Sequence, residues 1–106
     1  MKSRACSAAL AALLIAAWAG SARAESIKVE ISNLAFAPAQ VTAHVGDTIT
    51  WVNGDFVAHT APARNGAWDV QVPPKASKSV VLKAAGAVDY FCKFHPQMTG
   101  KITISP

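Results

Sequence analysis

Residues 88–104, which read Val-Asp-Tyr-Phe-Cys-Lys-Phe-His-Pro-Gln-Met-Thr-Gly-Lys-Ile-Thr-Ile, hold the pattern that decides the fold. The β-branched and aromatic residues at 88–91 and 102–104 predict two strands. Between these strands, Cys92, His95 and Met98 follow one another at three-residue spacings. The stretch therefore predicts a strand pair closed by a tight loop that carries sulfur and imidazole side chains.

Four stretches upstream show the alternation or the β-branched content that is typical of strands, and none shows a helical period. They cover residues 27–31, 41–45, 48–53 and 80–82. Gly, Pro and Asn residues fall between them, as expected of turns. Six or seven short strands with regular turns predict an all-β, antiparallel sandwich or barrel. Residues 54–72 form the longest irregular segment, and a loop of that length in a small domain is usually functional.

The first 24 residues have the three parts of a secretory signal peptide. Lys2 and Arg4 form a positive start, residues 8–19 are apolar, and residues 22–24 (Ala-Arg-Ala) supply a cleavage site. The apolar run is shorter than the roughly 20 residues of a membrane-spanning helix. We therefore expect cleavage before Glu25 and export of one domain, residues 25–106, to the periplasm.

Cleavage would change the composition of the chain. The whole chain has a net charge of +4, whereas residues 25–106 carry seven basic and six acidic side chains. A nearly neutral domain argues against binding of nucleic acid. Cleavage would also remove Cys6, so Cys92 would be the single cysteine and no internal disulfide could form. Because small domains often need a disulfide or a metal for stability, we expect a metal.

Cys92, His95 and Met98, together with the distant His59, offer the donors of a copper site. Thiolate and thioether sulfur are soft ligands, and a trigonal His2Cys site with a weak axial Met is the blue-copper arrangement. Taken singly, a Cys or Met is more often core filling and a His more often a surface residue. Their occurrence together in one exported, single-cysteine domain favours the metal site. We interpret His44, on the polar side of a predicted strand, as exposed and not a ligand.

These motifs resemble those of the small blue copper proteins, or cupredoxins, and most closely the amicyanin, pseudoazurin and plastocyanin group. The resemblance covers residues 27–104 and is carried by Gly-Asp-Thr-Ile-Thr-Trp-Val-Asn at 46–53, Ala-His-Thr at 58–60, and the short Cys-x-x-His-x-x-Met loop. It implies a Greek-key β-sandwich of about seven or eight strands that binds one Cu(I)/Cu(II) ion. It also implies that His59, Cys92 and His95 are equatorial copper ligands and that Met98 is the axial ligand.

The sequence departs from the family pattern beside the proposed ligands. Thr60 stands where the family usually has an Asn that braces the cysteine loop, and Lys93 stands where Thr or Ser is common. Gln97 replaces an aromatic residue that is frequent in amicyanin-like loops. Because neighbouring contacts orient ligands and tune a metal, these changes predict an altered brace and a more polar surround.

The resemblance further implies a carrier of single electrons, not an enzyme. We expect a monomer that meets transient redox partners (a dehydrogenase, a cytochrome or an oxidase) and has neither a nucleic-acid partner nor a membrane span. Electrons would pass through the exposed edge of His95, which we expect to be ringed by Phe94, Pro96, Ala58 and Pro62.

Three alternatives stay open at this point. A copper chaperone or copper-storage protein would use the same ligands but would exchange the metal readily. An enzyme would use Cys92 as nucleophile and His59 or His95 as base, although the sequence offers no recognisable oxyanion loop. A zinc-binding or metal-free structural module is the third, and Met98 is a poor ligand for zinc.

Overall fold

The computed structural model describes residues 23–106, which form nine strands and no helix. Nearly all of the predicted signal peptide lies outside these residues, so its cleavage stays a prediction. Over the described part, accordingly, no helix is available to cross a membrane. In chain order the strands are β1 (Ser26–Ser32), β2 (Ala35–Ala37), β3 (Gln40–His44), β4 (Thr48–Asn53), β5 (His59–Thr60), β6 (Gln71–Val72), β7 (Ser77–Val81), β8 (Gly86–Phe91) and β9 (Thr99–Ser105).

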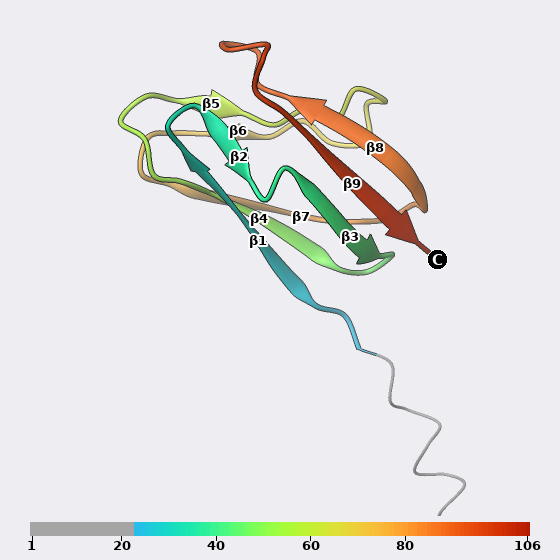
Figure 1. The fold of residues 1–106 in the computed structure, drawn as a ribbon. Helices are drawn as coiled ribbons and strands as arrows, with labels where there is room; N and C mark the ends of the chain where they lie inside the picture. The colour runs from blue at the N-terminus through green and yellow to red at the C-terminus, as the bar shows by residue number, and fades with distance from the viewer. Residues whose placement is uncertain (1–22) are drawn as a thin grey trace, which may run out of the picture.

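The strands build two main sheets and a short ribbon (Figure 1). One sheet has the order β2-β1-β4-β7, the other has the order β3-β9-β8, and β5 pairs with β6. This arrangement confirms the predicted all-β sandwich. The expectation of a purely antiparallel sandwich is wrong, because β1 pairs with β4 and β3 pairs with β9 in parallel. After β2, the chain crosses to the second sheet, where it forms β3, and then returns to the first sheet as β4. Alternation within a strand does not show which strands become neighbours, so the sequence could not reveal the parallel pairs.

The strand count slightly exceeds the expected seven or eight. β2, β5 and β6 contain only two or three residues each, which is too short for alternation to be recognised in the sequence. β7 begins at Ser77, earlier than the predicted start at Val80, and ends before the buried Leu82. As the edge strand of its sheet, β7 is mostly exposed and lacks a buried face to mark its limits.

Alternating burial explains why the longer strands form where the sequence predicts them. In β1, Val29 and Ile31 are buried while Lys28 and Glu30 are exposed. Side chains of a strand point alternately to its two faces, so one face of β1 joins the core and the other meets water. Residues of β3, β4, β8 and β9 follow the same rule, and together they form one hydrophobic core between the sheets.

An aromatic cluster fills the part of the core from which β8 leads into Cys92. Trp51 and Tyr90 are fully buried and meet edge to face, with ring centroids 5.4 Å apart. Tyr90 lies opposite Gly100 in the β8–β9 ladder, and its ring occupies the space that a side chain at residue 100 would need. Glycine at this position lets the ring close over β9, which fixes the strand pair beneath the loop at residues 92–98.

Candidate metal centre

The loop between β8 and β9 is held by its own backbone. The N–H of His95 donates to the carbonyl of Cys92 (3.3 Å), and the N–H of Met98 donates to the carbonyl of His95 (2.8 Å). The N–H of Cys92 in turn donates to the carbonyl of Met98 (3.1 Å), which closes the loop. The first two hydrogen bonds join residues three apart, so the spacing of the three candidate ligands is the spacing of the two turns.

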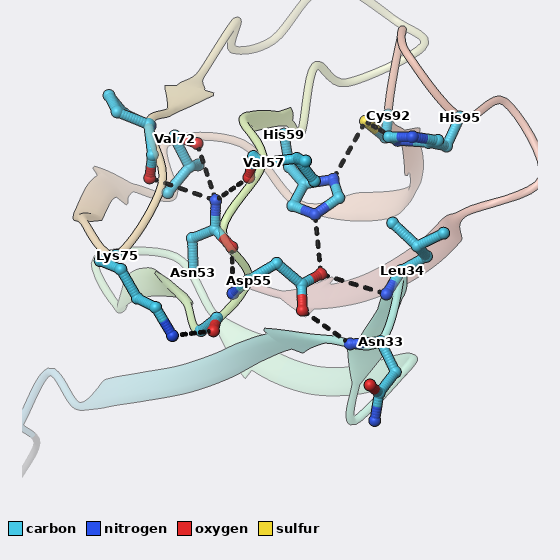
Figure 2. Close-up of polar contacts among 12 residues, drawn as sticks. Asn33, Leu34, Asn53, Asp55, Val57, His59, Val72, Lys75, Cys92 and His95 are labelled. Carbon is cyan, nitrogen blue, oxygen red and sulfur yellow. Dashed lines mark hydrogen bonds and ion pairs between the residues drawn. The ribbon is translucent and has the colours of Figure 1, made fainter.

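His59 reaches the same place from a different part of the chain. It lies in β5, where it pairs with Val72 of β6, and its side chain is fully buried. Figure 2 shows its ring between Cys92 on one side and Asp55 on the other. The segment that we expected to be an irregular functional loop therefore contains a short ribbon that presents His59.

Three of the four predicted ligands converge. The Sγ atom of Cys92 lies 3.7 Å from Nδ1 of His59 and 3.8 Å from Nδ1 of His95. All three donor atoms lie within 4.8 Å of one another. Cys92 is fully buried and His95 is half-buried. Met98, at the end of the same loop, is 2% exposed.

These separations fit a trigonal metal site. Thiolate and imidazole ligands bind a metal such as zinc at about 2.3 Å and about 2.0–2.1 Å, and copper is of similar size. Two such bonds at 120° place sulfur and nitrogen about 3.8 Å apart, and the two observed separations are 3.7 and 3.8 Å. The donor set and its spacing therefore suit one copper ion in a His2Cys plane.

The surroundings of Cys92 favour its thiolate form. Burial by itself raises the pKa of the thiol, but the Thr60 N–H, the adjacent imidazoles of His59 and His95, and the Phe94 N–H outweigh it and lower the pKa to about 6. Because the thiolate is the form that binds metals, the site holds its sulfur ready for coordination near neutral pH.

Comparison with known proteins identifies the family. A family model described as a cupredoxin-like domain matches residues 5–104. The chain belongs to the cupredoxin-like family. Its curated relatives include amicyanin of Paracoccus versutus, 30% identical over 87 residues, and amicyanin of Paracoccus denitrificans, 27% identical over 85 residues. The matches cover 76% and 74% of this chain but 66% and 65% of the relatives, so the chain spans just under two thirds of their length.

Solved structures agree with this assignment. A Cu(I) structure of an amicyanin mutant superposes with a TM-score of 0.70 at 26% identity, covering 76% of this chain and 82% of that one. A purple cupredoxin from Nitrosopumilus maritimus shares the fold at 24% identity, with a TM-score of 0.66 and coverage of 74% and 99%. The recognition of a small blue copper protein and the expectation of one copper ion are thereby confirmed. The assignment of the individual ligands stays a prediction.

One residue of this cupredoxin site was missed by sequence reasoning. Asp55 Oδ2 lies 2.9 Å from Nε2 of His59, on the side of the ring that faces away from Cys92 (Figure 2). In the sequence, Asp55 stands only in the Asn-Gly-Asp stretch at 53–55 that ends a predicted strand. Its position four residues before the candidate ligand His59 is the one available signal, and that spacing is too common to identify a partner.

A side-chain hydrogen bond still braces the cysteine loop, although its acceptor differs from the usual one of the family. Thr60 Oγ1 accepts a hydrogen bond of 2.8 Å from the backbone N–H of Lys93. The hydroxyl thus takes the place that the family usually gives to an Asn side chain. The Lys93 ammonium points elsewhere and lies 3.6 Å from the carboxylate of Asp69. The brace is therefore altered as predicted, because a hydroxyl replaces an amide, but the brace itself is present.

The surface around His95 is largely as predicted. Phe94 is 61% exposed, and Pro96, Ala58 and Gln97 are exposed as well. Pro62 is buried, so the expectation that it belongs to the rim is wrong. Its carbonyl accepts a hydrogen bond of 3.4 Å from the N–H of Phe91, which ties the residue to the end of β8. His44 is exposed, as predicted, and is not one of the converging residues.

Proposed function

We propose that this protein binds one copper ion through His59, Cys92, His95 and Met98 and carries single electrons between redox partners in the periplasm. The convergence of Cys92 Sγ with two imidazole nitrogens at 3.7 and 3.8 Å is the observation that carries the proposal. Soft sulfur and imidazole donors in this geometry suit both oxidation states of copper. Copper, when bound, would supply a one-electron couple.

The protein would contribute a rigid ligand frame. The β8–β9 loop is tied by local backbone hydrogen bonds, and His59 comes from a ribbon fixed to the sandwich. A frame held by many contacts changes little when the charge of the metal changes. A small rearrangement on electron transfer is what a carrier needs in order to exchange electrons quickly.

The exposed end of the site would serve as the contact surface. His95 is half-buried, whereas His59 is fully buried, so His95 offers the shorter route to solvent. The exposed side chains of Phe94, Pro96 and Ala58 give this end an apolar rim. Weak redox encounters bury small surfaces, so a rim of this kind is sufficient for transient docking. The partners would be redox proteins such as a dehydrogenase, a cytochrome or an oxidase.

A role without catalysis is also part of the proposal. The hollow beside the site, between Ala58 and Phe94, measures about 170 Å³. Pockets that bind small molecules usually measure about 300–1,000 Å³. This limited space supports an electron carrier over an enzyme that uses Cys92 as nucleophile.

Titration of the purified domain with Cu(II), followed by ascorbate, tests the proposed function. We expect an intense visible absorption band from charge transfer between the Cys92 thiolate and copper, which bleaches on reduction and returns on oxidation. His44→Ala, which changes the other histidine, should leave the band unchanged. Rapid loss of copper to a weak chelator would favour a chaperone or storage role instead. Absence of the band with copper present would reject the proposed site.

A further inference from the structure

Asp55 connects the candidate ligand His59 to a distant turn. Its Oδ2 lies 2.9 Å from His59 Nε2 and accepts a hydrogen bond of 3.1 Å from the N–H of Leu34. Its Oδ1 accepts a hydrogen bond of 2.9 Å from the N–H of Asn33. The Asp55 side chain is 17% exposed and the His59 side chain is 0% exposed. Figure 2 shows the carboxylate between the imidazole and the two backbone N–H groups.

The turn that supplies these N–H groups has an unusual backbone. Asn33 and Leu34 join β1 to β2, and both have positive φ, at 53° and 60°. Two consecutive positive φ angles are typical of a type I′ hairpin turn, where Asn is favoured at the first position and Gly at the second. Leu34 is therefore strained in this conformation. The carboxylate offsets part of that cost by accepting a hydrogen bond from each of the two residues.

These contacts favour the ionised form of Asp55. The N–H of Leu34 is the strongest influence, and burial opposes it, but the N–H of Asn33 and the imidazole of His59 add to it and hold the pKa of Asp55 below its ordinary value. A negative charge therefore stands behind the candidate ligand, 2.9 Å from its ring.

The contact also determines which ring nitrogen of His59 is free to bind a metal. A nitrogen that donates to a carboxylate carries its hydrogen, so Nε2 of His59 is the protonated atom and Nδ1 faces Cys92 Sγ. Carboxylates behind ligand histidines fix the ring and raise its basicity. Because Cu(II) carries more charge than Cu(I), a nearby anion stabilises it more.

We propose that Asp55 is a positioning residue of the metal centre, which holds His59 in its ligating orientation and stabilises Cu(II) relative to Cu(I). This inference rests on the proposed copper-binding function. The backbone N–H groups of Asn33 and Leu34, in the β1–β2 turn, hold the Asp55 carboxylate in place.

Three substitutions of Asp55 separate its charge from its hydrogen bond. Asp55→Asn keeps an oxygen that can accept from His59 but removes the charge. Asp55→Ala removes both, and Asp55→Glu keeps the charge on a longer side chain. Asp89→Asn is the matched control, because it removes one negative charge from an exposed position on β8. Cu(II) and Cu(I) affinities are measured by competition with chelators, and the potential by voltammetry.

We expect Asp55→Asn to lower the ratio of Cu(II) to Cu(I) affinity about tenfold, which raises the midpoint potential by about 59 mV. Asp55→Ala should weaken Cu(II) binding about 10- to 100-fold. Asp55→Glu should recover part of the wild-type affinity, and Asp89→Asn should match the wild type. Wild-type affinities and potential in both Asp55→Asn and Asp55→Ala would overturn the proposal.

A measurement on the metal-free protein separates this inference from the proposed function. NMR should detect a slowly exchanging Nε2–H of His59 in the wild type and in Asp55→Asn, and should not detect it in Asp55→Ala. A signal that persists in Asp55→Ala would show that Asp55 does not hold the ring. If the wild type shows this signal but binds no copper, the positioning of His59 stands while the copper function fails.

Discussion

The β8–β9 loop and the segment from Asn53 to Thr60 meet at the same centre, but different kinds of contact hold them. The loop places Cys92, His95 and Met98 by backbone hydrogen bonds among residues 92–98. The segment places one candidate ligand, His59, through contacts with parts of the chain about twenty residues away. The loop is therefore a local structure, whereas the segment depends on the completed sandwich. Substitutions in the loop should therefore affect the metal centre more than the stability of the fold. Substitutions in the segment should affect the stability of the fold more than the metal centre.

The largest expected effect comes from the loop. Cys92→Ser replaces the soft thiolate with a hydroxyl, so the visible charge-transfer band should disappear and the reversible couple should be lost. The metal-free variant should keep the wild-type circular dichroism, because the loop closes through backbone atoms that the substitution leaves intact. An intense band in Cys92→Ser would refute the role given to the thiolate.

Asn53 tests the segment. Its side chain is 1% exposed, its Nδ2 donates to the carbonyls of Val57, Val72 and Pro73, and its Oδ1 accepts from the N–H of Asp55. Asn53→Ala leaves these groups without their partner and should lower the free energy of unfolding by about 3 kcal/mol. Urea denaturation of the metal-free protein measures this change.

The control for this prediction is a second asparagine in an exposed turn. Asn65 Oδ1 accepts from the N–H of Ala67, where water can replace the side chain. Asn65→Ala should cost less than about 1 kcal/mol. Equal losses for the two variants would contradict the view that the segment depends on buried, long-range hydrogen bonds.

Thr60 lies where the two regions touch. Thr60→Val removes the oxygen that accepts from the Lys93 N–H and should cost about 1–2 kcal/mol, since that donor is partly buried. Thr60→Ser keeps the oxygen and should retain most of the stability. The visible spectrum of the copper form should broaden or shift in Thr60→Val and remain close to wild type in Thr60→Ser. Similar spectra and stabilities in both variants would show that the hydroxyl is not the brace.

The smallest effect on the metal centre is expected at Asp47, a carboxylate that also accepts from two backbone N–H groups but contacts none of the candidate ligands. Hydrogen bonds from Glu25 and then His44 lower its pKa, against the opposing effect of burial. Its contribution to stability is therefore complete above its ordinary pKa and is lost as the pH falls through the lowered native value.

Stability measured between pH 7 and pH 2 tests this assignment. The difference between the wild type and Asp47→Asn should be full at neutral pH and should shrink in acid below about pH 4. Copper affinity should not change. A loss of copper affinity in Asp47→Asn comparable to that in Asp55→Asn would mean that both act through general stability.

The sequence predicted the longer strands and the loop residues Cys92, His95 and Met98 for one reason, which is that their signals are local. The alternation in β1 and the three-residue spacing from Cys92 to Met98 both lie within a few residues. The short strands β5 and β6 carried no such signal, because they form only when paired with each other. His59 was proposed from its chemistry as a second imidazole donor, and the resemblance to the family supported it, but no local pattern of its own places it at the site.

The sequence by itself determined the all-β class, the loop with its sulfur and imidazole donors, and the exposure of His44. Only the tertiary structure decided that β1 and β4 run in parallel, that Pro62 is buried, and that Asp55 stands behind His59. The physical reason is the range of the contacts. Hydrogen bonds within a turn are fixed by neighbouring residues, whereas the carboxylate of Asp55 meets Asn33 and Leu34 only after the sheet has brought the two segments together.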